Sequence, residues 1–106
     1  MFVDQEGADP NFTATGVVTG NRVTVTVTGE VDMSTADAML RAATVDGAAA
    51  ATLDLREVSF FDSAAIHALL QLADRYGEAL LVHPSGQVRR VLEISGLSTQ
   101  PWLSAD

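Results

Sequence analysis

The strongest constraint on the fold is a strict alternation of side chains in residues 22–28. Valine occupies every second position from Val23 to Val27, and threonine follows each valine. Such alternation of β-branched residues is typical of a strand that buries one face and exposes the other. Residues 12–18 carry a weaker strand pattern, and Gly20-Asn21 between the two segments is a turn signal. The sequence therefore predicts a β-hairpin.

The apolar period then changes to a helical one at three places along the chain. Helices are predicted over residues 35–45, over residues 64–76 and between Ser85 and Gly96. A serine precedes each predicted helix and a glycine follows it, as expected of N-caps and C-terminal stops. The serines are Ser34, Ser63 and Ser85, and the glycines are Gly47, Gly77 and Gly96.

Two further strands are predicted between these helices. Residues 50–55 form the first, and the apolar residues Val58, Phe60 and Phe61 after it are assigned to a loop. Residues 79–83 form a nearly continuous apolar run, as expected of a central strand buried on both faces. The resulting order, β-β-α-β-α-β-α, predicts an α/β fold with a mixed, mainly parallel sheet and helices packed against it.

The pattern is that of one domain, which we expect to span residues 12–106. Residues 1–11 are acidic, and we expect them to form a flexible N-terminus. The core is expected to contain large apolar residues from the inward faces of the strands and helices. They are Val25, Val27, Leu53, Leu55, Leu69, Leu70, Leu81 and Leu92.

The charge balance narrows the choice of partner. The formal net charge is −8, which repels nucleic acid backbones and anionic lipid surfaces. A basic protein surface is therefore favoured as partner, and neither nucleic acid nor membrane is expected. The chain has no cysteine, so it forms no disulfide, and a cytoplasmic location is favoured.

Several classes of catalytic site lack the residues that they need. All six basic residues are arginines, which excludes Schiff-base lysines, phosphate-loop lysines and the receiver-domain lysine that would accompany Asp54. His67 and His83 are the only histidines, with no metal-ligand spacing around them. No Gly-x-Ser-x-Gly motif is present. We therefore expect no enzyme activity, no catalytic residue, no metal and no cofactor.

Two polar segments remain as candidates for function. Gly29-Glu30-Val31-Asp32 follows the second predicted strand, and on its own it indicates only a polar strand-to-helix loop. Phe61-Asp62-Ser63-Ala64-Ala65-Ile66 precedes the second predicted helix. Taken alone it indicates an N-cap. A serine at a helix start also lies where backbone N–H groups can hold an anion, so a cap and a phosphate site are compatible.

Together these segments resemble the STAS domain family, and in particular the bacterial anti-sigma factor antagonists, or anti-anti-sigma factors. The resemblance covers about residues 12–100 and is carried by three motifs in order. They are Thr28-Gly29-Glu30-Val31-Asp32, then Leu53-Asp54-Leu55 with Val58-Ser59-Phe60-Phe61-Asp62-Ser63, and finally Val91-Leu92-Glu93-Ile94-Ser95-Gly96-Leu97. The sequence departs from the family pattern at Ala64, Ala65 and Ile66, where the family usually has Ser or Thr, then Gly, then Leu.

The resemblance implies a protein that is switched by phosphorylation and regulates transcription. By position, Ser63 is the phosphorylated serine, and the partner is an anti-sigma factor that is an ATP-dependent serine kinase. The unphosphorylated antagonist binds this partner and frees a sigma factor, whereas the phosphorylated form releases the partner. Partner contact is expected at the acidic edge and on the second helix, at Glu30, Asp32, Asp62, Ser63, Ala64, Ile66 and His67.

One alternative stays open within the same family. Because Ala64 and Ala65 replace a hydroxyl residue and a glycine, the chain could instead be a STAS module that is not phosphorylated and acts as a protein-binding or nucleotide-sensing scaffold. A small hydrolase is the alternative from a different class, and the missing lysine and cysteine argue against it.

Overall fold

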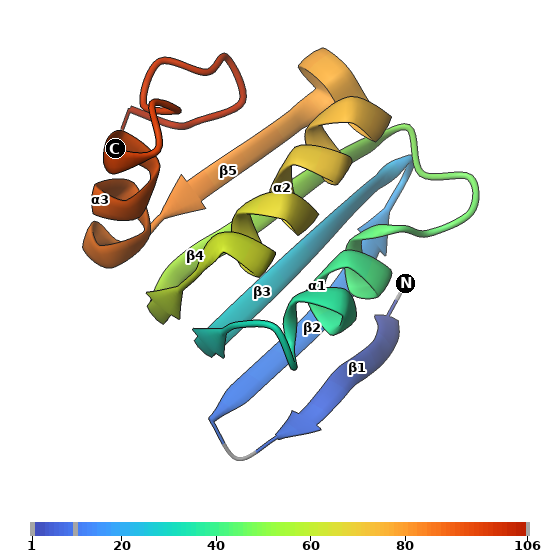
Figure 1. Cartoon of the computed structure of the whole chain (residues 1–106). Coiled ribbons are helices and arrows are strands. Elements are labelled where there is room, and N and C mark those ends of the chain that lie inside the picture. The colour runs from blue at the N-terminus through green and yellow to red at the C-terminus, as the bar shows by residue number, and fades with distance from the viewer. Residues whose placement is uncertain (1, 10, 106) are drawn as a thin grey trace.

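The computed structural model describes residues 2–9 and 11–105. In chain order its elements are β1 (Phe2–Asp9), β2 (Phe12–Thr19), β3 (Arg22–Val31), α1 (Ala36–Ala43), β4 (Ala50–Phe61), α2 (Ser63–Tyr76), the 3₁₀ turn η1 (Gly77–Ala79), β5 (Leu80–Pro84) and α3 (Gly86–Ile94). Helices α1 and α2 lie side by side across one face of the sheet, and α3 packs near β4 and β5 (Figure 1). Among the described helices, none is both long and apolar enough to cross a membrane.

The five strands form one mixed sheet in the order β1-β2-β3-β4-β5. The pairs β1/β2 and β2/β3 are antiparallel, and the pairs β3/β4 and β4/β5 are parallel. From β2 onward the order of elements is the predicted β-β-α-β-α-β-α, so the predicted α/β fold class is confirmed. Strand β1 was not predicted, since we expected a flexible N-terminus over residues 1–11. Its backbone pairs with β2, and backbone pairing of this kind needs no alternating apolar pattern in the sequence.

The alternation in β3 sets the two faces of the sheet. Val23, Val25 and Val27 are fully buried under the helices, and the threonines between them are on the face that none of the described helices covers. The hydroxyl and methyl groups of threonine suit such a partly solvent-exposed surface. The hydroxyl groups of Thr13 and Thr28 hydrogen-bond to each other there at 2.6 Å. Six of the eight expected core residues are buried: Val25, Val27, Leu53, Leu55, Leu69 and Leu92.

The expected loop at Val58, Phe60 and Phe61 is wrong, because β4 continues as a strand to Phe61. The spacing of these apolar residues did not reveal the strand, because the pairing of β3 with β4 shifts register near Thr28 and again near Glu30. Each shift interrupts the strict alternation by which a strand is recognised. The longer β4 carries the Asp-Ser segment to the very end of the sheet.

Two residues expected in the core are exposed, and both expectations were wrong. Leu81 is 38% exposed because β5 is not central, and alternate residues of β5 face the uncovered side of the sheet. Leu70 is 41% exposed because it lies on the side of α2 that turns away from the sheet. The outer edge of β5 pairs with the C-terminal segment and not with a further strand. The N–H of Val82 donates to the carbonyl oxygen of Trp102 at 2.8 Å.

Candidate functional site

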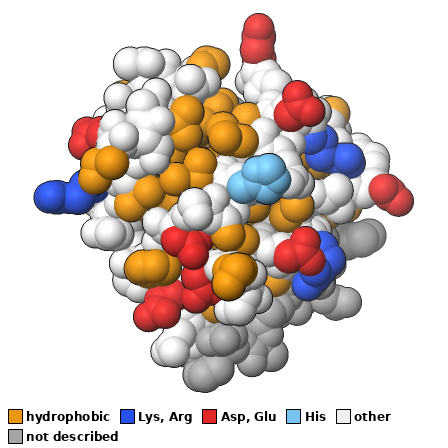
Figure 2. Space-filling view, viewed as in Figure 1, with side chains coloured by type: hydrophobic (Ala, Val, Ile, Leu, Met, Phe, Trp, Pro, Cys, Tyr) orange, Lys and Arg blue, Asp and Glu red, His pale blue; other side chains and the backbone are white. Residues whose placement is uncertain are grey.

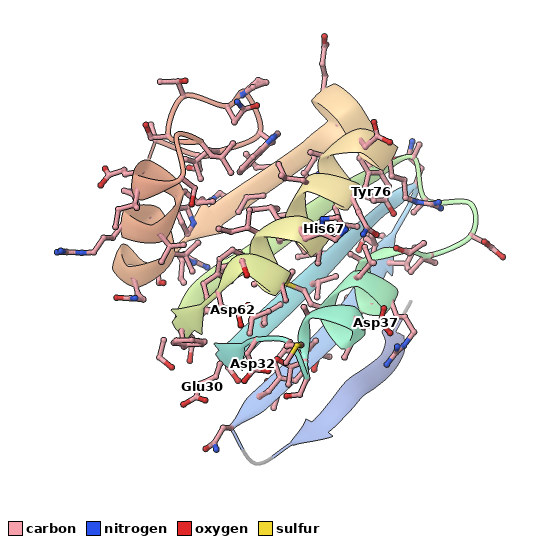
Figure 3. The ribbon with its side chains drawn as sticks, viewed as in Figure 1. Glu30, Asp32, Asp37, Asp62, His67 and Tyr76 are labelled. Carbon is pink, nitrogen blue, oxygen red and sulfur yellow. The ribbon has the colours of Figure 1, made fainter. Side chains whose placement is uncertain are left out.

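The two polar segments singled out in the sequence lie next to each other at the carboxyl ends of β3 and β4. Glu30 pairs with Phe60 and Val31 with Phe61 in the parallel ladder. The N–H of Asp62 donates to the carbonyl oxygen of Val31 at 3.3 Å, so the pairing continues into the start of α2. Glu30, Asp32 and Asp62 therefore gather at one end of the molecule (Figure 3). We call this end the acidic edge, and it lies where open α/β sheets commonly hold their binding sites.

Gly29 fixes the course of the chain as it enters this edge. Its φ is +89°, and a Cβ built at this position would lie 1.9 Å from the carbonyl oxygen of Asn11. The same oxygen accepts a hydrogen bond of 2.7 Å from the N–H of Glu30. Only glycine allows both the left-handed conformation and this close approach of two backbones.

The carboxylate of Asp32 holds the loop between β3 and α1. It accepts hydrogen bonds from the backbone N–H of Ser34 at 2.9 Å and from the Ser34 hydroxyl at 2.7 Å. These bonds stabilise the charged form and lower the pKa of Asp32 below its ordinary value of 3.8. The Thr35 hydroxyl accepts from the Asp32 N–H and donates to the carbonyl oxygen of Glu30, each at 2.9 Å.

The prediction that Ser34 caps α1 is wrong. The N-cap position is Thr35, whose side chain makes no capping bond, and the helix runs from Ala36 to Ala43. Ser34 lies outside the helix and bonds to Asp32 instead. A serine and an aspartate two residues apart can satisfy each other locally, and this competes with capping of the helix.

Asp62, and not Ser63, caps α2. The Asp62 carboxylate accepts a hydrogen bond of 3.1 Å from the N–H of Ala65, whereas Ser63 is the first residue of the helix itself. The Ser63 side chain is exposed. Its hydroxyl therefore stands at the helix N-terminus, beside backbone N–H groups that favour an anion.

The other candidate residues divide between two sides of α2. Ala64 and His67 line a shallow groove of about 180 Å³ between α1 and α2, together with Ala36, Leu40 and Ala68. We call it the α1–α2 groove. Ile66 does not line it; this residue is half-buried and packs against the core. Ala65 is fully buried, so its methyl group is accommodated where the resemblance led us to expect a glycine.

Met33 is the site residue that sequence reasoning missed. It borders the α1–α2 groove and is 86% exposed, the most exposed of the large apolar residues within residues 11–105. Figure 2 shows apolar side chains at the surface among acidic groups on this face of the molecule. Its signal in the sequence was weak, since one apolar residue between Asp32 and Ser34 fits no helical or strand period.

The two histidines lie on different elements of the fold. His67 is exposed on α2 and borders the groove, whereas His83 is on β5, opposite Asp54 in the ladder with β4. Among the described side chains, those of residues 11–105, no group of three or more histidine, aspartate or glutamate residues is arranged to hold a metal ion.

Comparison with known proteins places this geometry in a family. The family model of the STAS domain matches residues 13–106. The fold is similar to that of an anti-sigma factor antagonist from Mycobacterium paratuberculosis, with a TM-score of 0.77 and 27% identity over 92% of this chain and 90% of that one. No curated protein sequence gives a significant match.

Two more distant structures share the fold alone. The anti-sigma factor antagonist SpoIIAA, in its unphosphorylated form, gives a TM-score of 0.64 at 23% identity, over 86% of this chain and 85% of that one. A STAS-domain antisigma-factor antagonist from Rhodobacter sphaeroides gives a TM-score of 0.56 at 14% identity, over 87% of this chain and 96% of that one.

Proposed function

The chain belongs to the STAS domain family, and from that membership we propose that it is an anti-sigma factor antagonist switched off by phosphorylation of Ser63. The partner is an anti-sigma factor that is also an ATP-dependent serine kinase. The unphosphorylated protein binds this partner, and a sigma factor is thereby released. The protein itself is a binding protein without catalytic residues or cofactor. Because the switch requires ATP and a sigma factor, we place the protein in the cytoplasm.

One observation carries the proposal: Ser63 is exposed as the first residue of α2, directly beside the acidic edge. A kinase needs a hydroxyl that it can reach, and the capping bond is made by Asp62. The Ser63 hydroxyl is therefore available without loss of the helix cap. The similarity to the mycobacterial anti-sigma factor antagonist, at 27% identity, supports the same role.

The chemistry of the switch is a phosphoryl transfer. The Ser63 Oγ attacks the γ-phosphorus of ATP, the bond to the bridging oxygen of ADP breaks, and the hydroxyl proton passes to a base of the kinase. The phosphoserine carries about −1.5 to −2 charges at neutral pH. The first turn of α2 accommodates this charge through its outward N–H groups, so that phosphorylation leaves the fold intact.

Release of the partner follows from the charges around Ser63. The phosphate stands next to Asp62 and at the same edge as Glu30 and Asp32. Water stabilises such a group of like charges, but a partner that covers the edge removes this water and leaves the charges to repel one another. Binding is therefore weakened by charge and bulk at the interface, without a large rearrangement.

The test begins with a pull-down from the source cytoplasm with the wild-type protein, to obtain the anti-sigma factor. The purified pair is then incubated with ATP, and the mass of the antagonist and its calorimetric affinity are measured before and after. We expect one phosphate at Ser63, none in Ser63→Ala, and loss of affinity on phosphorylation. Equal affinities of the two folded forms would reject the switch.

A second candidate function is a STAS scaffold that binds its partner without being phosphorylated. The observation in its favour is that Ala64 and Ala65 follow Ser63. It predicts partner binding in the pull-down but no gain in mass with ATP. Nucleotide sensing gains less support, because the α1–α2 groove of about 180 Å³ is smaller than the roughly 300–1,000 Å³ of sites for drug-sized ligands.

A further inference from the structure

The α1–α2 groove has the surface chemistry of a docking site for one apolar side chain. Small apolar side chains are prominent in its lining, namely Ala36, Ala64 and Ala68, and the larger Leu40 lines it as well. Alanines leave space between the two helices that larger residues would fill. The space of about 180 Å³ suits a single side chain, and it is below the range of small-molecule pockets.

Met33 stands at the border of this groove and is held there by an ordered loop. The bonds of Asp32 with Ser34 fix the residues on both sides of it, and Thr35 ties the loop to the end of β3. Because the backbone around this side chain of 86% exposure is already fixed, a partner that covers it restricts the side-chain rotamers and does not have to order the loop as well. Its flexible thioether adapts to the shape of a contacting group.

The charges around the groove indicate the chemistry of the occupant. Asp37 borders the groove, Asp32 of the acidic edge directly precedes Met33 in the chain, and the chain as a whole carries a formal net charge of −8. Arg41 is a basic residue on the same surface, and it forms an ion pair with Asp37. A segment with a basic face beside its apolar residue complements such a surface.

We propose that the α1–α2 groove receives one large apolar side chain from an amphipathic, basic helix of the anti-sigma factor, with Met33 packed beside it. This inference rests on the proposed function and names the surface through which it operates. The site extends the interface from the acidic edge along the side of α2 that faces α1.

The position of the groove also couples docking to the switch. Ala64 in its lining directly follows Ser63, and His67 follows one helical turn later on the same side. A side chain seated in the groove therefore brings the partner close to Ser63, the residue before Ala64. A phosphate at Ser63 adds charge and bulk beside the groove and opposes this approach.

The test uses the anti-sigma factor that the wild-type protein retains in the pull-down. Met33→Ser removes the apolar side chain from an exposed position, and Leu81→Ser is the matched control on the opposite face of the sheet. We expect Met33→Ser to weaken the affinity about tenfold or more, as for a residue that dominates an interface, and Leu81→Ser to leave it unchanged. Circular dichroism verifies that both variants are folded.

A second measurement needs no variant. With methionine methyl groups labelled with ¹³C, the Met33 resonance of the unphosphorylated protein should shift when the anti-sigma factor is added, while that of the fully buried Met39 should not. If the wild type binds and neither Met33→Ser nor the Met33 resonance responds, the groove proposal is overturned while the proposed function stands. If the Met33 resonance changes with protein concentration alone, the occupant is a second copy of this chain. If the wild type retains no anti-sigma factor, both proposals fail.

Discussion

The backbone N–H of Asp62 donates to the carbonyl oxygen of Val31 at 3.3 Å, and this bond joins the two polar segments of the chain. Residues about thirty positions apart in the sequence thereby form one edge. The bond continues the parallel pairing of β3 with β4 beyond the last strand residues. The geometry of the edge is therefore a property of the sheet, and it follows that changes in backbone pairing near it disturb the site.

Replacement of Gly29 by alanine should be more destabilising than the same change at Gly20. Both glycines have positive φ, at +89° and +63°, but a Cβ at Gly20 meets nothing within 4 Å, whereas one at Gly29 collides with Asn11. Gly20→Ala should cost about 1–2 kcal/mol for its backbone conformation alone. Gly29→Ala adds the displacement of Asn11 and loss of its bond to Glu30. Urea unfolding of both variants measures the difference, and equal losses of free energy would contradict it.

Asp62 and Ser63 should contribute differently to stability although they are neighbours. Asp62→Ala removes the bond to the Ala65 N–H, and loss of such a cap costs about 0.5–2 kcal/mol. Ser63→Ala changes an exposed residue without a capping role, and the free energy of unfolding should stay within about 0.5 kcal/mol of the wild type. Thermal or urea unfolding of the two variants tests this. A larger loss in Ser63→Ala than in Asp62→Ala would mean that the serine is the cap.

The ionisation of Asp32 should make the β3–α1 loop sensitive to acid. Its pKa is lowered in the folded state, chiefly by the hydrogen bond from the Ser34 hydroxyl. The folded protein thus binds fewer protons than the unfolded chain, and the stability from Asp32 is present above the ordinary value of 3.8 and is lost as pH falls through the folded pKa. An NMR titration of the Asp32 carboxyl carbon should give a pKa below 3.8 that rises in Ser34→Ala. An unchanged pKa in that variant would assign the shift to other groups.

The sequence predicted the elements whose period was unbroken. The alternation of Val23 to Val27 and the helical spacing after Ser63 each gave one consistent face, and the order from β2 to α3 followed from them. Strand β1 was missed because its residues do not alternate between apolar and polar types, and backbone pairing such as that of β1 with β2 does not require this alternation. The end of β4 was missed because register shifts broke its period.

The position of the candidate site in the fold was predictable from the sequence, but the arrangement of its side chains was predictable only in part. The parallel strand order brings the segments that contain Glu30 and Ser63 to the same edge, and this follows from topology. Which side chain caps α2 depends on a one-residue choice between Asp62 and Ser63, both of which are good caps. The exposure of Met33 depends on how α1 packs beside α2, which no local pattern encodes.

Leu69 and Leu70 provide a matched pair for the assignment of the inner face of α2. Leu69 is fully buried and Leu70 is 41% exposed. Leu69→Ala should cost about 2–5 kcal/mol, the usual range for truncation in a core, and Leu70→Ala should cost less than about 1 kcal/mol. The midpoints of thermal unfolding compare them directly. A larger loss for Leu70→Ala would show that the helix is rotated relative to the sheet.

The acidic edge should act mainly on the rate at which the partner associates. The Glu30 side chain is exposed at the end of β3, so its charge is available for attraction at a distance, whereas the Asp32 carboxylate is engaged by Ser34. An exposed ion pair is worth about 0.2–1 kcal/mol, so Glu30→Gln should lower the association rate constant about 1.5- to 5-fold at low salt. The dissociation rate should change little, because rim charges act on encounter more than on the bound state.

Salt and position provide the controls for this prediction. Raising the ionic strength screens the attraction, so the difference between Glu30→Gln and the wild type should shrink as salt is added. Asp74→Asn removes an equal charge from an exposed position in the second half of α2, and it should have a smaller effect than Glu30→Gln. Surface plasmon resonance at several salt concentrations separates the two rate constants. Equal effects of the two variants on association would mean that the partner responds to net charge alone. A slower dissociation confined to Glu30→Gln would mean that the Glu30 charge destabilises the bound state and does not guide its formation.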